Sequence, residues 1–209
     1  DHLQDKGLLE KTPLYFQNSS QWQRRLRKHC FESTRLSDHL AGFDFLGPID
    51  THWHTFGYDV GMMNEFYEMK PGESIRDVRM YNSATVLLSD LGTNRNFSAN
   101  EELRISILAS HFGAGDLRNA QLTLYLTLDG KLLSQQCCQG NVENGAVSNL
   151  YEFRCLLPNV TIPGAMKLYA VLASGDVWTE NEWELYLFPD AICDFGQLVL
   201  DPVDAESLW

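Results

Sequence analysis

The chain has 209 residues, of which 44% are hydrophobic, and its 16 Lys and Arg against 28 Asp and Glu give a net charge of −12. This acidic balance argues against nucleic acid or an anionic membrane surface as the partner. No apolar run approaches the ~18 residues that a membrane-spanning helix requires. The first residues, Asp1 to Lys6, are polar, so the sequence shows no signal peptide, which favours a cytoplasmic location without establishing it.

The first predicted element is a helix in the stretch from Leu14 to Leu40. Its apolar residues recur at helical spacing and predict one apolar stripe, formed by Trp22, Leu26, His29 and Cys30. A run of basic residues is interleaved with this stripe, namely Arg24, Arg25, Arg27 and Lys28. Such a run is usually a solvated helix face, so we expect these side chains to point into water.

A short buried strand is predicted next, within residues 42–54. Phe43 and Phe45 alternate with polar neighbours, and a Gly-Pro break follows them. The strand ends on four side chains suited to a binding site: Asp50, His52, Trp53 and His54. The acid and the two histidines share one parity, so an extended backbone places them on one face and the tryptophan on the other. Polar clusters at the C-terminal end of a strand are where open α/β sheets and barrels hold their sites.

From Ala84 onward the pattern is that of a β protein. Seven apolar or alternating runs follow, at Thr85–Leu88, Leu103–Phe112, Leu122–Leu128, Lys131–Cys137, Leu150–Leu157, Met166–Ala173 and Glu182–Phe188. Alternation with period two indicates antiparallel sheet with one buried face, and Asp129-Gly130 between two runs is a strong hairpin signal. Seven short strands in about 105 residues are typical of an immunoglobulin-like sandwich.

The predicted fold is therefore mainly β and has three parts. Residues 1–70 form an α/β segment, residues 75–190 form an immunoglobulin-like antiparallel β-sandwich, and residues 191–209 are a tail or the start of a further α/β domain. In this last part Leu198–Asp201 is a predicted strand, and Asp204–Trp209 is the predicted first turn of a helix. Both ends of the chain look like cuts through a longer protein.

Cysteine usage does not indicate a metal site. The five cysteines are Cys30, Cys137, Cys138, Cys155 and Cys193. No CxxC pair occurs, so a structural zinc site is not expected. We expect reduced thiols that serve as small apolar side chains, and we expect no cofactor.

The order of these parts resembles glycoside hydrolase family 2 and its β-galactosidase-like relatives. The stretch Leu40–Leu46 resembles the last barrel strand of that family, Val60–Phe66 resembles the segment that follows it, and Lys70–Glu73 matches the exit from the barrel. Phe97–Leu103 and Ser110–Gly113 look like the immunoglobulin-like domain after the barrel. The segment 1–70 would thus be the remnant at the end of a (β/α)8 barrel.

This resemblance implies hydrolysis of β-glycosides with retention, by two carboxylic acids about 5 Å apart. In the family those acids lie on earlier barrel strands, and nothing in this chain matches their motifs, so we assign no catalytic residue here. What carries over is the rim of the sugar site at Asp50, His52, Trp53 and His54, where the aromatic ring can stack on a sugar and the polar groups can bind hydroxyls. The implied partners are a β-glycoside and the rest of the parent barrel or a companion chain.

Two alternatives remain open. Asp50-Thr51-His52-Trp53-His54 also resembles the strand end at which amidohydrolases hold a metal, so His52 and His54 could belong to a metal-dependent hydrolase. That family needs further ligands, and only His111 follows.

The second alternative is a carbohydrate-binding or interaction module without catalysis. Trp178, Trp183 and Tyr186 could form its stacking platform, although Trp183 alternates with leucines and is expected in the core. Glu65 and Glu68 lie near the predicted site in sequence, but two acids three residues apart on a loop are expected to be solvated.

Overall fold

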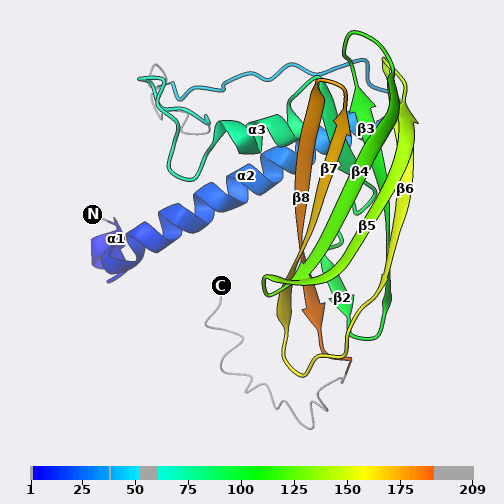
Figure 1. The fold of residues 1–209 in the computed structure, drawn as a ribbon. Coiled ribbons are helices and arrows are strands. Elements are labelled where there is room, and N and C mark those ends of the chain that lie inside the picture. The colour runs from blue at the N-terminus through cyan, green and yellow to red at the C-terminus, as the bar shows by residue number, and fades with distance from the viewer. Residues whose placement is uncertain (1, 38, 52–60, 191–209) are drawn as a thin grey trace.

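The computed structural model describes residues 2–37, 39–51 and 61–190, and its described part is mainly β (Figure 1). The N-terminal part contains helix α1 (His2–Asp5), a 3-10 turn (Leu9–Lys11), the long helix α2 (Thr12–Leu36) and helix α3 (Ile75–Tyr81). The predicted long helix is thus confirmed, with Pro13 in its first turn, where the missing N–H costs no helical hydrogen bond. No helix in the described ranges is long and apolar enough to cross a membrane.

The described strands form two sheets. The strands are β1 (Thr85–Ser89), β2 (Asn96–Ser98), β3 (Glu102–His111), β4 (Leu117–Leu128), β5 (Lys131–Val142), β6 (Ala146–Leu156), β7 (Gly164–Ser174) and β8 (Val177–Phe188). One sheet has the order β1-β3-β6, and the other has the order β2-β8-β7-β4-β5. All neighbours pair antiparallel except β2, which pairs parallel to β8. All seven predicted strands are present, and β2 and α3 are additional elements.

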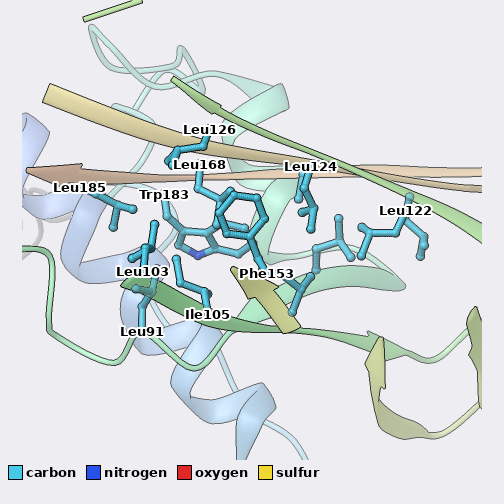
Figure 2. Packing of buried hydrophobic residues seen from close by; sticks show 14 of the residues in the cluster. Leu91, Leu103, Ile105, Leu122, Leu124, Leu126, Phe153, Leu168, Trp183 and Leu185 are labelled. Atoms are coloured by element: carbon cyan, nitrogen blue, oxygen red, sulfur yellow. The ribbon is translucent and has the colours of Figure 1, made fainter. Parts of the chain in front are cut away.

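The core lies between the two sheets, as the alternation of the strands requires (Figure 2). Leu122, Leu124 and Leu126 of β4 point inward from the larger sheet, and Phe153 of β6 meets them from the smaller one. Trp183 of β8 is also buried in this cluster, which confirms its predicted packing role. Burial of large side chains on this scale is the main stabilising contribution to such a domain.

Side chains rather than backbone ladders connect the two sheets along their open edges. On one side, Thr179 Oγ1 donates to Thr85 O at 3.0 Å, and Asn181 Nδ2 donates to Leu87 O at 2.6 Å, joining β8 to β1. On the other side, Gln136 Nε2 of β5 donates to Arg154 O of β6 at 2.7 Å. These bonds satisfy edge carbonyls that would otherwise lie unpaired in a partly buried setting.

Helix α2 packs by its C-terminal half on the sandwich edge between β8 and β1. The carboxylate of Glu32 is buried and accepts from Asn181 Nδ2 at 2.8 Å. Arg35 donates to Ser83 O at 2.6 Å and to Ser110 Oγ at 3.2 Å. The N-terminal half of α2 projects away from both sheets, together with α1 (Figure 1).

The expectation of a solvated basic face on α2 is wrong. Arg27 is buried against Glu73 with an N–O distance of 2.6 Å, and Arg25 pairs with Glu184 of β8. Arg24 donates to the carbonyl of Gly72. Through these ion pairs and hydrogen bonds, the basic residues of α2 bind the helix both to the segment before α3 and to the sandwich.

The predicted apolar stripe of α2 is not a buried face either. Trp22, Leu26 and Cys30 are exposed, and the apolar side chain that α2 buries is Phe31. Phe31 follows the stripe by one residue, which turns the buried face of the helix about 100° away from it. The expected burial of the stripe is thus wrong.

The predicted buried strand near Phe43 is also wrong. Residues 42–48 form no strand, and directly after them Ile49 makes an isolated parallel bridge with Met63. The alternation still has a cause, since the rings of Phe43 and Phe45 lie 4.7 Å and 5.3 Å from the Phe31 ring. Residues 42–48 therefore lie along α2 and are not part of a sheet.

The four described cysteines carry free thiols, as expected, but Cys30 and Cys137 are exposed and do not fill a core. Cys193 and the predicted elements of 191–209 lie outside the described residues.

Candidate functional site

The predicted site is described in the structure only at Asp50. Its Oδ1 accepts the backbone N–H of Gly61 at 2.9 Å, and its Oδ2 pairs with Lys70 Nζ at 2.8 Å. The backbone joins the same pieces, because Asp50 N donates to Met63 O at 2.9 Å and Lys70 N donates to Met62 O at 2.9 Å. A carboxylate held on both oxygens fixes the position of its loop.

Gly61 is required at this point by space. A Cβ on Gly61 would lie 2.6 Å from both Asp50 N and Ile49 C. Both atoms belong to the backbone and cannot move aside without displacing the chain at Ile49 and Asp50. The glycine thus allows the chain to return close enough for its N–H to reach the carboxylate of Asp50.

His52, Trp53 and His54 lie outside the described residues. The grouping of these side chains with Asp50 therefore stays a prediction. What the structure adds is that Asp50, two residues before His52, is anchored by Gly61 and Lys70, which sequence spacing does not reveal.

A tight turn at residues 64–68 lies beside the Asp50 anchor. Asn64 Oδ1 accepts the N–H groups of Phe66 and Glu68, each at 2.9 Å, which is a side-chain-capped turn. Glu65 and Glu68 are exposed, as expected. Phe66 and Tyr67 are exposed at the tip of the turn, and sequence reasoning missed this aromatic pair although Asn64 marks the turn.

His111 is a structural histidine. Its Nε2 lies 2.8 Å from Gly115 O and its Nδ1 lies 2.7 Å from Thr85 Oγ1. Because a carbonyl only accepts, Nε2 donates to Gly115 O, and Nδ1 shares a hydrogen bond with the threonine hydroxyl. Both ring nitrogens are thus engaged, and within the described ranges no group of three or more His, Cys, Asp or Glu side chains is arranged to hold a metal.

A second charged centre, missed by the sequence analysis, lies on the larger sheet beside α3. Glu180 of β8 accepts from Arg76 Nε at 2.7 Å and from Arg76 Nη2 at 2.8 Å, and the hydroxyl of Tyr169 also donates to it. These hydrogen bonds from Arg76 lower the pKa of Glu180 below its ordinary value of 4.5. The fork geometry of the guanidinium fixes α3 on the sheet.

The Glu180→Gln variant is expected to lose about 1 kcal/mol of stability at pH 7, since half-exposed Arg76 remains screened by water. Because the folded-state pKa of Glu180 is lowered, its stabilising contribution is present above pH 4.5 and disappears as the pH falls through that lowered value. Urea unfolding at pH 7 and pH 3 should show the difference from wild type shrinking in acid. Glu143→Gln on an exposed turn is the control, and an equal difference at both pH values would contradict the assignment.

Comparison with known proteins identifies a family match for the sandwich only. A family described as "Domain of unknown function (DUF8488)" matches residues 101–189, which is most of the sandwich. No curated protein matches this chain.

Among solved structures, the sporulation control protein Spo0M from Bacillus subtilis is 12% identical, with a TM-score of 0.34 over 51% of this chain and 50% of that one. The β-glucuronidase of Parabacteroides merdae is 17% identical, with a TM-score of 0.34 over 45% of this chain and 13% of the enzyme. A family 123 glycoside hydrolase from Clostridium perfringens is 8% identical, with a TM-score of 0.36 over 51% and 27%. The match spans half or less of each of these proteins, and the similarity is a weak, partial likeness of fold.

Proposed function

We propose that this chain is the C-terminal portion of a β-glycoside hydrolase of the β-galactosidase-like type. In this proposal residues 1–70 complete a barrel supplied by other residues, and the sandwich is an accessory domain. The order of motifs described above suggests this arrangement, and one structural observation carries it further.

That observation is a difference in burial. The sandwich encloses a buried apolar core, whereas many large apolar side chains of the N-terminal part are exposed. Outside the lining of the cleft described below, large apolar side chains are exposed throughout the first part: Leu9, Leu14, Tyr15, Phe16, Leu40, Phe43, Leu46, Phe66, Tyr67 and Met69. Single exposed apolar residues are ordinary, but this density in one short part indicates surfaces that pack against further residues. A barrel to which α2 contributes one helix would cover them.

The strand order supports an immunoglobulin-type sandwich. A three-stranded sheet β1-β3-β6 faces a sheet in which β8, β7 and β4 are neighbours, as in domains of that type. The antiparallel pairs β3–β6 and β4–β7 join strands that are not consecutive in the chain, which is the Greek-key connection. This arrangement fits the accessory domain that the proposal requires.

The anchored Asp50 supports a binding role for the residues that follow it. The ion pair with Lys70 and the bond from Gly61 fix the backbone from which His52, Trp53 and His54 extend. In the proposal these three contact the sugar, by stacking and by hydrogen bonds to hydroxyls, and Asp50 positions them. The catalytic carboxylates come from the remainder of the barrel.

The 209-residue chain is expected to hydrolyse no glycoside, whereas the full product of its gene is expected to turn over at about 1–1000 per second. Retaining chemistry needs an acid with a raised pKa next to an ionised nucleophile, and the described acids near Asp50 are solvated or paired. Nitrophenyl β-galactoside and nitrophenyl β-glucuronide are suitable substrates for both proteins. Turnover by the 209-residue chain alone, or inactivity of the full product on a panel of nitrophenyl β-glycosides, would overturn the proposal.

A further inference from the structure

A cleft of about 430 Å³ lies between α2, β8 and the loop that follows β1. Its walls come from Trp22, Leu26 and His29 of α2, from Thr93 and Arg95 of the loop, and from Tyr186 of β8. The cleft shares no residue with the Asp50 anchor or with the turn at residues 64–68. Its volume is within the range of small-molecule sites.

Aromatic side chains line the cleft, namely Trp22, Tyr81, Trp183 and Tyr186. Trp22 is 60% exposed on the α2 side, so one face of its indole is free, and Tyr186 is half-buried on the opposite side. The indole of Trp183 is buried beneath, with Lys28 Nζ 5.1 Å from its ring centroid. A largely exposed indole and a half-buried phenol that line the same cleft suit a ligand with a flat apolar face.

The charged groups of the cleft are balanced and mostly paired with one another. Four basic residues (Arg24, Arg25, Lys28, Arg95) stand against five acidic ones (Glu32, Glu73, Asp77, Glu182, Glu184). Arg25 pairs with Glu184 at the mouth of the cleft, and Lys28 pairs with Glu32 on its floor. Because neither sign of charge is in clear excess, the cleft offers little attraction to an anion such as a phosphate or to a cation.

Paired charges still have hydrogen-bonding capacity for a neutral ligand. The carboxylate of Glu184 has free lone pairs, Arg25 has further N–H groups, and the exposed Thr93 adds a hydroxyl. Lys28 and Arg95 also line the cleft, and burial lowers the pKa of each. A ligand with many hydroxyls and one apolar face matches this combination of groups.

From this geometry we propose that the cleft is a binding site for a neutral saccharide. One sugar ring stacks on Trp22, and its hydroxyls bind the Arg25–Glu184 pair and Thr93. The proposal does not depend on the glycosidase function, because the cleft is separate from the Asp50 segment and needs no chemistry.

The test compares two tryptophans with the same exposure. Trp22 is 60% exposed in the cleft, and Trp178 is 61% exposed but eight residues from Tyr186 along β8, about 26 Å away in a strand. Lactose, cellobiose and chitobiose are titrated into the 209-residue chain and into the Trp22→Ala and Trp178→Ala variants by calorimetry. We expect binding of at least one of these sugars, with affinity lowered about tenfold by Trp22→Ala and unchanged by Trp178→Ala.

A second variant keeps the test independent of folding. Glu184→Gln retains the size of the side chain, leaves the core untouched and should also weaken binding, while circular dichroism and the unfolding midpoint stay those of wild type. Glucuronic acid and glucose 6-phosphate should bind no better than glucose, because the cleft has no excess of basic groups. Three results would overturn the proposal. They are equal effects of the two tryptophan variants, a preference for the anionic sugars, and failure of all three disaccharides to bind at about 50 mM, a concentration well above the 1 mM dissociation constant that corresponds to about −4.1 kcal/mol.

Discussion

Replacing Arg27 by methionine is expected to lower the free energy of unfolding by about 3–5 kcal/mol. The side chains of Arg27 and Glu73 are only 7% and 5% exposed, and they join α2 to the segment before α3. Methionine fills a volume similar to that of arginine. The protein is therefore destabilised mainly because the buried carboxylate of Glu73 loses its charged partner. Urea unfolding followed by circular dichroism measures the change, and hydrogen exchange should place the lost protection in α2 and α3.

The exposed pair Arg104–Glu102 provides the matched control. Its side chains are 58% and 43% exposed, so Arg104→Met should cost less than about 1 kcal/mol. The double variant Arg27→Met/Glu73→Gln should recover much of the loss, because no charge is then left buried without a partner. Equal effects of Arg27→Met and Arg104→Met would show that the burial of the first pair has no energetic consequence.

Phe153→Ala is expected to destabilise the sandwich by about 3–5 kcal/mol. Phe153 is fully buried and stands between the inward leucines of β4 and the indole of Trp183 (Figure 2). Removing the ring leaves a cavity that neighbouring strands, fixed by their ladders, can close only in part. Thermal and urea unfolding measure the loss.

Phe112 is the control for this prediction. It follows β3 directly but is 60% exposed, so Phe112→Ala should change stability by no more than about 0.5 kcal/mol. A small effect at both positions would mean that the two sheets do not share one packed core.

The sandwich could be predicted from the sequence because its signals are local. Leu122, Leu124 and Leu126 alternate over a long run, and Asp129-Gly130 has the positive φ angles, 48° and 78°, that a tight hairpin turn requires. Strand β2 has only three residues and one buried side chain, Phe97, so it has no period to detect. Its pairing comes from β8, far away in the chain.

The errors in the N-terminal part share one physical cause, which is that partners distant in sequence decide the outcome. The alternation of Phe43 and Phe45 correctly indicates that both rings face one side, but a strand needs a ladder partner and none is beside this segment in the described structure. Arg27 looks like any solvated arginine until Glu73 is placed next to it. Charge patterns along a helix cannot reveal such a partner.

The candidate site could be predicted only in part for the same reason. Asp50 was recognisable as a polar residue after an apolar segment, but its partners Gly61 and Lys70 lie 11 and 20 residues further on. The cleft beside Trp22 combines α2, the loop after β1 and strand β8, which lie far apart in the sequence. No local sequence motif predicts that these three elements meet to form a cleft.

The side-chain amide of Asn181 has a mechanical consequence. Its one nitrogen binds both Leu87 O of the smaller sheet and Glu32 of α2, while its oxygen accepts the N–H of Glu182. A force that separates α2 from the sandwich therefore also acts on the hydrogen bonds between the two sheets. Force applied to α2, as when a neighbouring domain rotates, therefore reaches the joint between the two sheets through this group as well as through the other contacts of α2, so the helix and the sheet edge should yield together.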